Sequence, residues 1–129
     1  MGFIGGYILP NEGITELDRK DAYYIIDDIV FLADKTTEND FEVKITISIY
    51  PTIEDRNARI NLLETDEYTT VTTRNNITTT NNLFEKYYVI IKPMIIDRIK
   101  PLLNIKLNRD THDEIPSEYS EYCTLTDHI

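Results

Sequence analysis

The fold is decided by the stretch Phe41-Glu42-Val43-Lys44-Ile45-Thr46-Ile47-Ser48-Ile49-Tyr50, in which apolar and polar side chains alternate as far as Tyr50. Successive side chains of a strand point to opposite faces of a sheet, so the apolar set would form one buried stripe. These apolar residues are mostly β-branched or aromatic, which suits a pleated surface. A helix would scatter them around its circumference. The pattern therefore predicts an internal strand with one covered face.

The preceding run, residues 22–33, is apolar on both parities except at Asp27 and Asp28. This fits one long strand covered on both faces, or two strand segments with a bulge near the Asp pair. A helix is disfavoured by the density of β-branched and aromatic residues. In a regular strand Asp27 and Asp28 would face opposite sides, whereas a bulge would let them converge. The polar residues 34–40 predict a connector that makes the two strands antiparallel.

Two segments at the N-terminal end are less regular. Residues 3–9 predict a short strand that is interrupted at Gly5 and Gly6, where the backbone can bend or approach another segment closely. Residues 17–21 are polar and charged, and they predict a loop into the next strand.

The middle of the chain is polar. Residues 52–59 form a link with room for one helical turn, and residues 67–73 predict a Thr-rich strand at a sheet edge. The run 74–82 fits either a loop or a hairpin around Asn75 and Asn76.

Beyond residue 82 the apolar period changes to three and four, which predicts a helix. The residues on its apolar face are Leu83, Phe84, Tyr87, Tyr88, Ile90 and Ile91. Asn81 or Asn82 would cap it. Pro93 is expected to end or kink this helix, because its ring clashes with the preceding turn. A second short helix would then run to Pro101, and residues 102–107 would form a last strand.

Residues 109–129 are acidic, with six Asp and Glu side chains against the single basic residue Arg109. This composition predicts a poorly ordered tail, or an arm that orders on a neighbour. Its anchors would be Tyr119, Tyr122, Leu125 and Ile129. Deleting the segment is expected to leave the fold intact and to weaken assembly.

Together these elements predict an α+β fold that is mainly antiparallel β. We expect a small sandwich-like sheet with one or two helices in the C-terminal third and an extended acidic tail. Residues 1–108 would form a single β-rich domain, and residues 109–129 the tail or arm. The length of 129 residues and the apolar fraction of 41% are enough for one core.

Charge and composition exclude several functional classes. Thirteen basic residues against 23 acidic ones give a formal net charge of −10, which repels phosphate backbones and argues against a nucleic-acid partner. The single cysteine cannot form an intrachain disulfide, and no Cys/His spacing predicts a zinc site. The N-terminus lacks the basic start of a signal peptide, and no apolar run is long enough to span a membrane. We therefore expect synthesis in the cytoplasm, no membrane partner and no cofactor.

No catalytic, cofactor-binding or metal-binding residue is predicted. His112, His128 and Cys123 all lie in the expected tail, which cannot hold a side chain rigidly. Acidic neighbours of Cys123 would raise the pKa of its thiol, and no nucleophile or phosphate-binding motif is present. The chain is therefore expected not to be an enzyme. Tyrosine is enriched at protein interfaces, and the expected interface residues are Tyr68, Val71, Tyr119, Tyr122, Leu125 and Ile129.

The order of features from Gly13 to Tyr88 adds a resemblance. The features are Ala22-Tyr23-Tyr24-Ile25 entering a strand, a Lys-containing connector, an alternating strand ending in Ile49-Tyr50, an Arg-containing link, a Tyr-containing strand, and Asn82-Leu83-Phe84 opening a helix with Tyr87-Tyr88. This order resembles small structural or tail-associated proteins of tailed bacteriophages, in which a compact β domain closes with such a helix.

The resemblance implies a virion component made in the host cytoplasm. Such a protein would occupy a place in a head, neck or tail through contacts with other subunits of the virion, including copies of itself. The resemblance implies no catalytic residues. The alternative is a small acidic soluble inhibitor or host-interaction protein that blocks a basic partner. An enzyme of unrecognised type is a third class, which no cluster of residues supports.

Overall fold

The computed structural model describes residues 2–9, 18–33, 40–73 and 83–128. These residues form an α+β fold with one five-stranded antiparallel sheet, in the strand order β4-β3-β2-β1-β5. The strands are β1 (Gly2–Tyr7), β2 (Arg19–Ala33), β3 (Asp40–Tyr50), β4 (Glu64–Thr73) and β5 (Leu125–His128). The helices are α1 (Ile53–Ala58), α3 (Leu83–Lys106) and the 3₁₀ helix η1 (Ser117–Cys123).

The alternating stretch is β3, an internal strand between β2 and β4. Its odd-numbered side chains from Val43 to Ile49 are at most 2% exposed. The predicted internal strand with one covered face is confirmed. The helical turn expected within residues 52–59 and the strand expected within residues 3–9 are also present, as α1 and β1.

β2 is one strand with a bulge. Its register against β3 shifts between Ile26 and Asp28, so Asp27 is the extra residue. Before the bulge Ala22, Tyr24 and Ile26 are buried in the core, whereas beyond it Ile29 and Phe31 pack against the core. The expected bulge near the Asp pair is therefore confirmed, but β2 is one continuous strand rather than two segments. Coverage on both faces does not extend to the far half of the strand, where Val30 and Leu32 are 38% and 42% exposed.

α3 is a single helix of 24 residues that continues through Pro93 and Pro101. The expected helix end at Pro93, the second short helix and the last strand at 102–107 are wrong. A proline in a helix removes a hydrogen bond to the carbonyl four residues earlier, here those of Val89 and Asp97. Val89 is 71% exposed and Asp97 is exposed as well, so water can satisfy both carbonyls. The opposite face is buried at Tyr87, Ile91, Ile95, Ile99 and Leu103.

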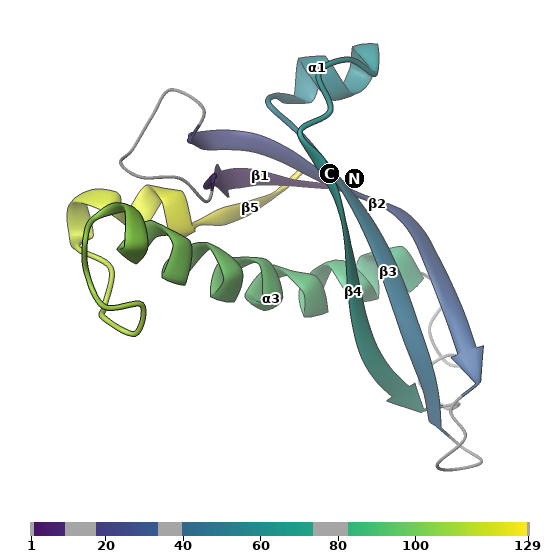
Figure 1. The fold of residues 1–129 in the computed structure, drawn as a ribbon. Coiled ribbons are helices and arrows are strands. Elements are labelled where there is room, and N and C mark those ends of the chain that lie inside the picture. The colour runs from purple at the N-terminus through teal and green to yellow at the C-terminus, as the bar shows by residue number, and fades with distance from the viewer. Residues whose placement is uncertain (1, 10–17, 34–39, 74–82, 129) are drawn as a thin grey trace.

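The fold has two layers, with α3 across one face of the sheet and α1 on the other side (Figure 1). The core lies between α3 and the sheet. The described residues thus form a single sheet covered by a helix, in place of the expected sandwich-like arrangement. The two ends of the described chain meet in the sheet, because Gly2 of β1 lies opposite His128 of β5.

The C-terminal segment is part of the sheet. β5 pairs antiparallel with β1, and Leu125 is 7% exposed within the core. The chain passes close to two glycines of β1: a Cβ added at Gly6 would lie 1.7 Å from the carbonyl oxygen of Tyr122, and the Gly6 N–H donates to the carbonyl of Thr124 at 3.3 Å. The close approach predicted at Gly5 and Gly6 is confirmed. The expectation of a poorly ordered tail or free arm is not confirmed. The strand β5 of this acidic segment pairs with β1 at the edge of the sheet.

The remaining expectations concern the start of β2 and residues outside the described ranges. β2 begins at Arg19, so the expectation of a loop at residues 17–21 is wrong for residues 19–21, and residue 17 lies outside the described residues. The connector at 34–39, the Asn75-Asn76 region, the helix cap at Asn81 or Asn82, and Ile129 lie outside the described residues.

Candidate interaction site at the edge of the sheet

β4 forms one edge of the sheet, as the Thr-rich pattern predicts. Its ten residues pair with β3 from Glu64 opposite Ile49 to Thr73 opposite Asp40. No described segment pairs with the other side of the strand. Proteins commonly protect such edges with charged side chains. Here the three acidic residues lie at the start of β4, and residues 69–73 carry only Thr and Val.

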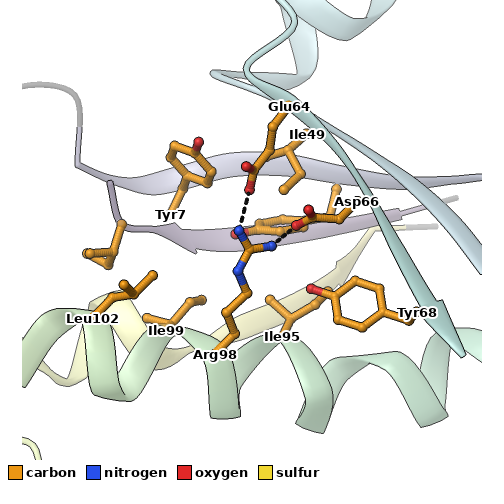
Figure 2. A pocket seen from close by; sticks show the side chains of 11 residues that line it. Tyr7, Ile49, Glu64, Asp66, Tyr68, Ile95, Arg98, Ile99 and Leu102 are labelled. Atoms are coloured by element: carbon orange, nitrogen blue, oxygen red, sulfur yellow. Dashed lines mark ion pairs between the residues drawn. The ribbon is translucent and has the colours of Figure 1, made fainter. Parts of the chain in front are cut away.

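The acidic start of β4 is held by the helix. Figure 2 shows the guanidinium of Arg98, from α3, between the carboxylates of Glu64 and Asp66. The distance from Arg98 Nη2 to a Glu64 carboxylate oxygen is 3.3 Å, and Asp66 forms a second ion pair with Nη1. The Arg98 side chain is 44% exposed, so solvent screens these pairs and each contributes little stability. Their main consequence is positional, because they tie the acidic start of the edge strand to α3.

A small cavity lies beside this cluster. Its volume is about 20 Å³, which is room for about one water molecule. Tyr7, Tyr24 and Tyr68 line it, and burial raises the pKa of each phenol above the ordinary value of 10.0. The phenols are therefore protonated at neutral pH and do not act as bases there. The cavity is a packing feature of the helix–sheet contact rather than a substrate pocket.

Sequence reasoning missed Arg98, Glu64 and Asp66. Glu64 and Asp66 have the same strand parity as Tyr68, which packs against the core, so two acids on a core-facing parity were a usable signal. Nothing in the order of residues indicates that Arg98, on a helix more than thirty positions later, is their partner.

The far half of the sheet has an open face on the side away from α3. Register aligns Val30 of β2 with Lys44 of β3 and Thr69 of β4, and the next row aligns Leu32, Glu42 and Val71. Val71 is 59% exposed. The Lys44 ammonium lies 3.0 Å from the Glu67 carboxylate across this face. The face thus combines exposed aliphatic side chains with one ion pair, beside the uncharged part of the edge.

The predicted interface residues fall into two groups at opposite edges of the sheet. Tyr68 and Val71 are on β4, where Tyr68 packs against the core and Val71 points away from it. At the other edge Tyr119 and Tyr122 are half-buried with ring centroids 6.5 Å apart, and Leu125 is buried in its own chain. Only Val71 is described as freely exposed. The structure therefore does not bring these residues into one patch.

A second depression lies between α3 and the C-terminal segment. Its volume is about 680 Å³, and both His112 and Cys123 line it. Burial raises the pKa of the Cys123 thiol, which opposes formation of the reactive thiolate. Among the described residues no three His, Cys, Asp or Glu side chains are grouped so as to hold a metal ion.

Comparison of the chain with protein-family models, curated proteins and solved structures gives no match. No helix in the described ranges is long and apolar enough to cross a membrane.

Proposed function

We propose that this protein is a non-enzymatic assembly protein that binds other protein subunits through the free edge of β4. The observation that supports this most is the uncharged segment 69–73, which among the described strands is paired only with β3. An unpaired strand edge presents a row of backbone donors and acceptors that a strand from another chain can complete. The Thr- and Val-rich composition of this segment favours the extended conformation that such pairing requires.

The open sheet face strengthens this proposal. A strand added beside β4 would place its side chains next to those of Thr69 and Val71, at the spacing of neighbouring strands. Val71, 59% exposed in the single chain, would then become covered. The surface is thus suited to strand addition by a second copy or by a different subunit.

The resemblance of the sequence to small structural proteins of tailed bacteriophages supports a more specific proposal. In it, the chain is a component of a virion head, neck or tail, and its partners are other virion subunits. Purified particles should then contain the protein at a fixed copy number, as measured by quantitative mass spectrometry. Its recovery only as free protein in the lysate would contradict the virion assignment.

Edge pairing has a direct test in a matched pair of valines. Val71→Lys puts a charge on the edge strand, whereas Val30→Lys puts the same charge on the same face but on internal strand β2. We expect Val71→Lys to weaken association by tenfold or more in sedimentation experiments, because the added ammonium group would lose water when a new strand covers position 71. Val30→Lys should have a much smaller effect. Equal effects would instead indicate stacking of sheet faces, and no effect of either would contradict the proposal.

The acidic surface favours one alternative, a small inhibitor or host-interaction protein. Asp110, Asp113, Glu114, Glu118 and Glu121 are all exposed on the folded C-terminal segment. Such a surface would bind a basic protein by charge, and the binding would fall steeply with salt. Binding to a purified basic enzyme that is lost at high salt and unchanged by Val71→Lys would favour this alternative over strand addition.

A further inference from the structure

A polar depression lies on the side of the sheet that carries α1. Its volume is about 330 Å³, and it opens between α1 and the neighbouring strands β2 and β3. The residues that line it are Ile25, Asp27, Ser48, Tyr50, Arg56 and Arg59. The bulge in β2 provides one wall, because Asp27 accepts a hydrogen bond from the Ser48 hydroxyl on this face.

The loop that carries the two arginines is held by its own hydrogen bonds. Thr52 caps α1 by accepting the Asp55 N–H at 3.1 Å, and the Asp55 carboxylate accepts from the Thr52 hydroxyl and from the Asn61 amide, both at 3.2 Å. The Leu63 N–H donates to the Ile49 carbonyl at 2.8 Å and returns the chain to β3. Asp55, the acidic neighbour of Arg56, is therefore engaged within the loop.

The arginines of this depression differ from most other cations in the chain. Among the Lys and Arg side chains that the structure describes, ion pairs with carboxylates are formed by Arg19, Lys20, Lys44, Lys92, Arg98, Lys106 and Arg109. Arg56, Arg59 and Lys100 form none within that described set. In a chain of net charge −10, two of these three cations line one depression.

Arg59 also occupies a backbone position that favours another residue. It ends α1 in the left-handed conformation, with φ of 56° and ψ of 44°. Glycine is the usual residue there because it lacks the Cβ that makes this conformation costly. An arginine at this site adds a guanidinium group at some expense of backbone energy, which fits a role for the side chain.

We propose that this depression binds an oxyanion, a carboxylate or phosphate group, between the guanidinium groups of Arg56 and Arg59. Guanidinium groups donate two parallel hydrogen bonds to such groups. The Tyr50 hydroxyl is a further donor in the lining, and the Asp27 carboxylate favours a singly charged group over a doubly charged one. The site is independent of the edge of β4 and of any assembly through it.

The test is a titration of the full chain with acetate and, separately, with inorganic phosphate. Ionic strength is held constant with sodium chloride, and backbone amide shifts of residues 54–61 are followed by NMR. We expect saturable shifts with at least one of the two anions, and the tighter binder identifies the class. Arg56→Gln should weaken binding about tenfold or more, because it removes charge-assisted hydrogen bonds. Lys100→Gln, which removes a cation outside the depression, should not weaken binding.

Arg59→Gly separates a binding role from a structural one. Glycine suits the backbone at this position, so the variant should melt at a temperature no lower than the original chain. It should nevertheless bind the anion about tenfold or more weakly. Unchanged binding in Arg59→Gly, or shifts with both anions no larger than with chloride alone, would overturn the proposal.

Discussion

The ammonium group of Lys106 lies 2.6 Å from the carboxylate of Asp18, and the two side chains are 1% and 0% exposed. Lys106 is the last residue of α3, and Asp18 immediately precedes β2. The other carboxylate oxygen of Asp18 accepts the Leu9 N–H at 2.9 Å. One buried ion pair therefore joins the end of the helix to both the exit of β1 and the start of β2.

Breaking this pair from one side is expected to destabilise the fold strongly. Lys106→Met removes the ammonium group that lies beside the buried Asp18 carboxylate, and the free energy of unfolding should fall by about 3 kcal/mol or more. Urea denaturation of the full chain measures it. Lys106→Met combined with Asp18→Asn should recover most of the loss, because Asn is neutral and can still accept the Leu9 N–H. A loss below about 1 kcal/mol in the single variant would show that the charge is not held as described.

Gly6→Ala is expected to detach the C-terminal strand. The added Cβ would meet the Tyr122 carbonyl, and the backbone segment leading into β5 would have to move. Amides of residues 125–128 should lose protection in hydrogen exchange, and thermal stability should fall because Leu125 leaves the core. Ser120→Ala, an exposed change in the same segment, serves as the control. If these amides stay protected in Gly6→Ala, the close contact between Gly6 and the Tyr122 carbonyl is not what allows β5 to pair with β1.

Stability is expected to fall at alkaline pH. Burial raises the pKa of Tyr24 above its ordinary value of 10.0, and its hydroxyl donates to the Gly6 carbonyl. The folded chain therefore keeps this proton while the unfolded chain releases it above pH 10, so stability is fully present below that pH and decreases above it. Melting temperatures from pH 8 to 11 measure the effect. Tyr24→Phe should show a shallower decrease, and an identical slope would assign the effect to other groups.

The spacing of apolar residues predicted burial where one face of a strand or helix packs against the core along its length. The period of two in β3 predicted its buried face, and the three- and four-residue spacing before Pro93 predicted the buried residues Tyr87, Tyr88 and Ile91 of α3. The expectation of a helix end at Pro93 failed, because a proline can also be accommodated inside a helix. Pro93 did not end α3, because its missing hydrogen bond falls on the solvent side, and whether a carbonyl can reach water depends on how the helix is docked.

The candidate site was predictable only in part. The Thr-rich pattern placed an edge strand and named Val71, because composition reports that a segment is extended and uncovered. It could not separate Val71 from Leu125, since exposure depends on which segment packs against each residue. Arg56 and Arg59 appeared as parts of an ordinary polar link, because only the packing of α1 against β2 and β3 shows that they line one depression.

By itself the sequence determined the internal strand, the bulge at the Asp pair as one of two alternatives, and the buried face of α3 before Pro93. These follow from side-chain periodicity, which is a property of neighbouring residues. The tertiary structure alone decided that the acidic C-terminal residues complete the sheet beside β1, that Asp18 meets Lys106, and that Arg98 meets the acids of β4. These contacts join residues far apart in the chain, so their partners depend on how whole elements pack and cannot be read from composition nearby.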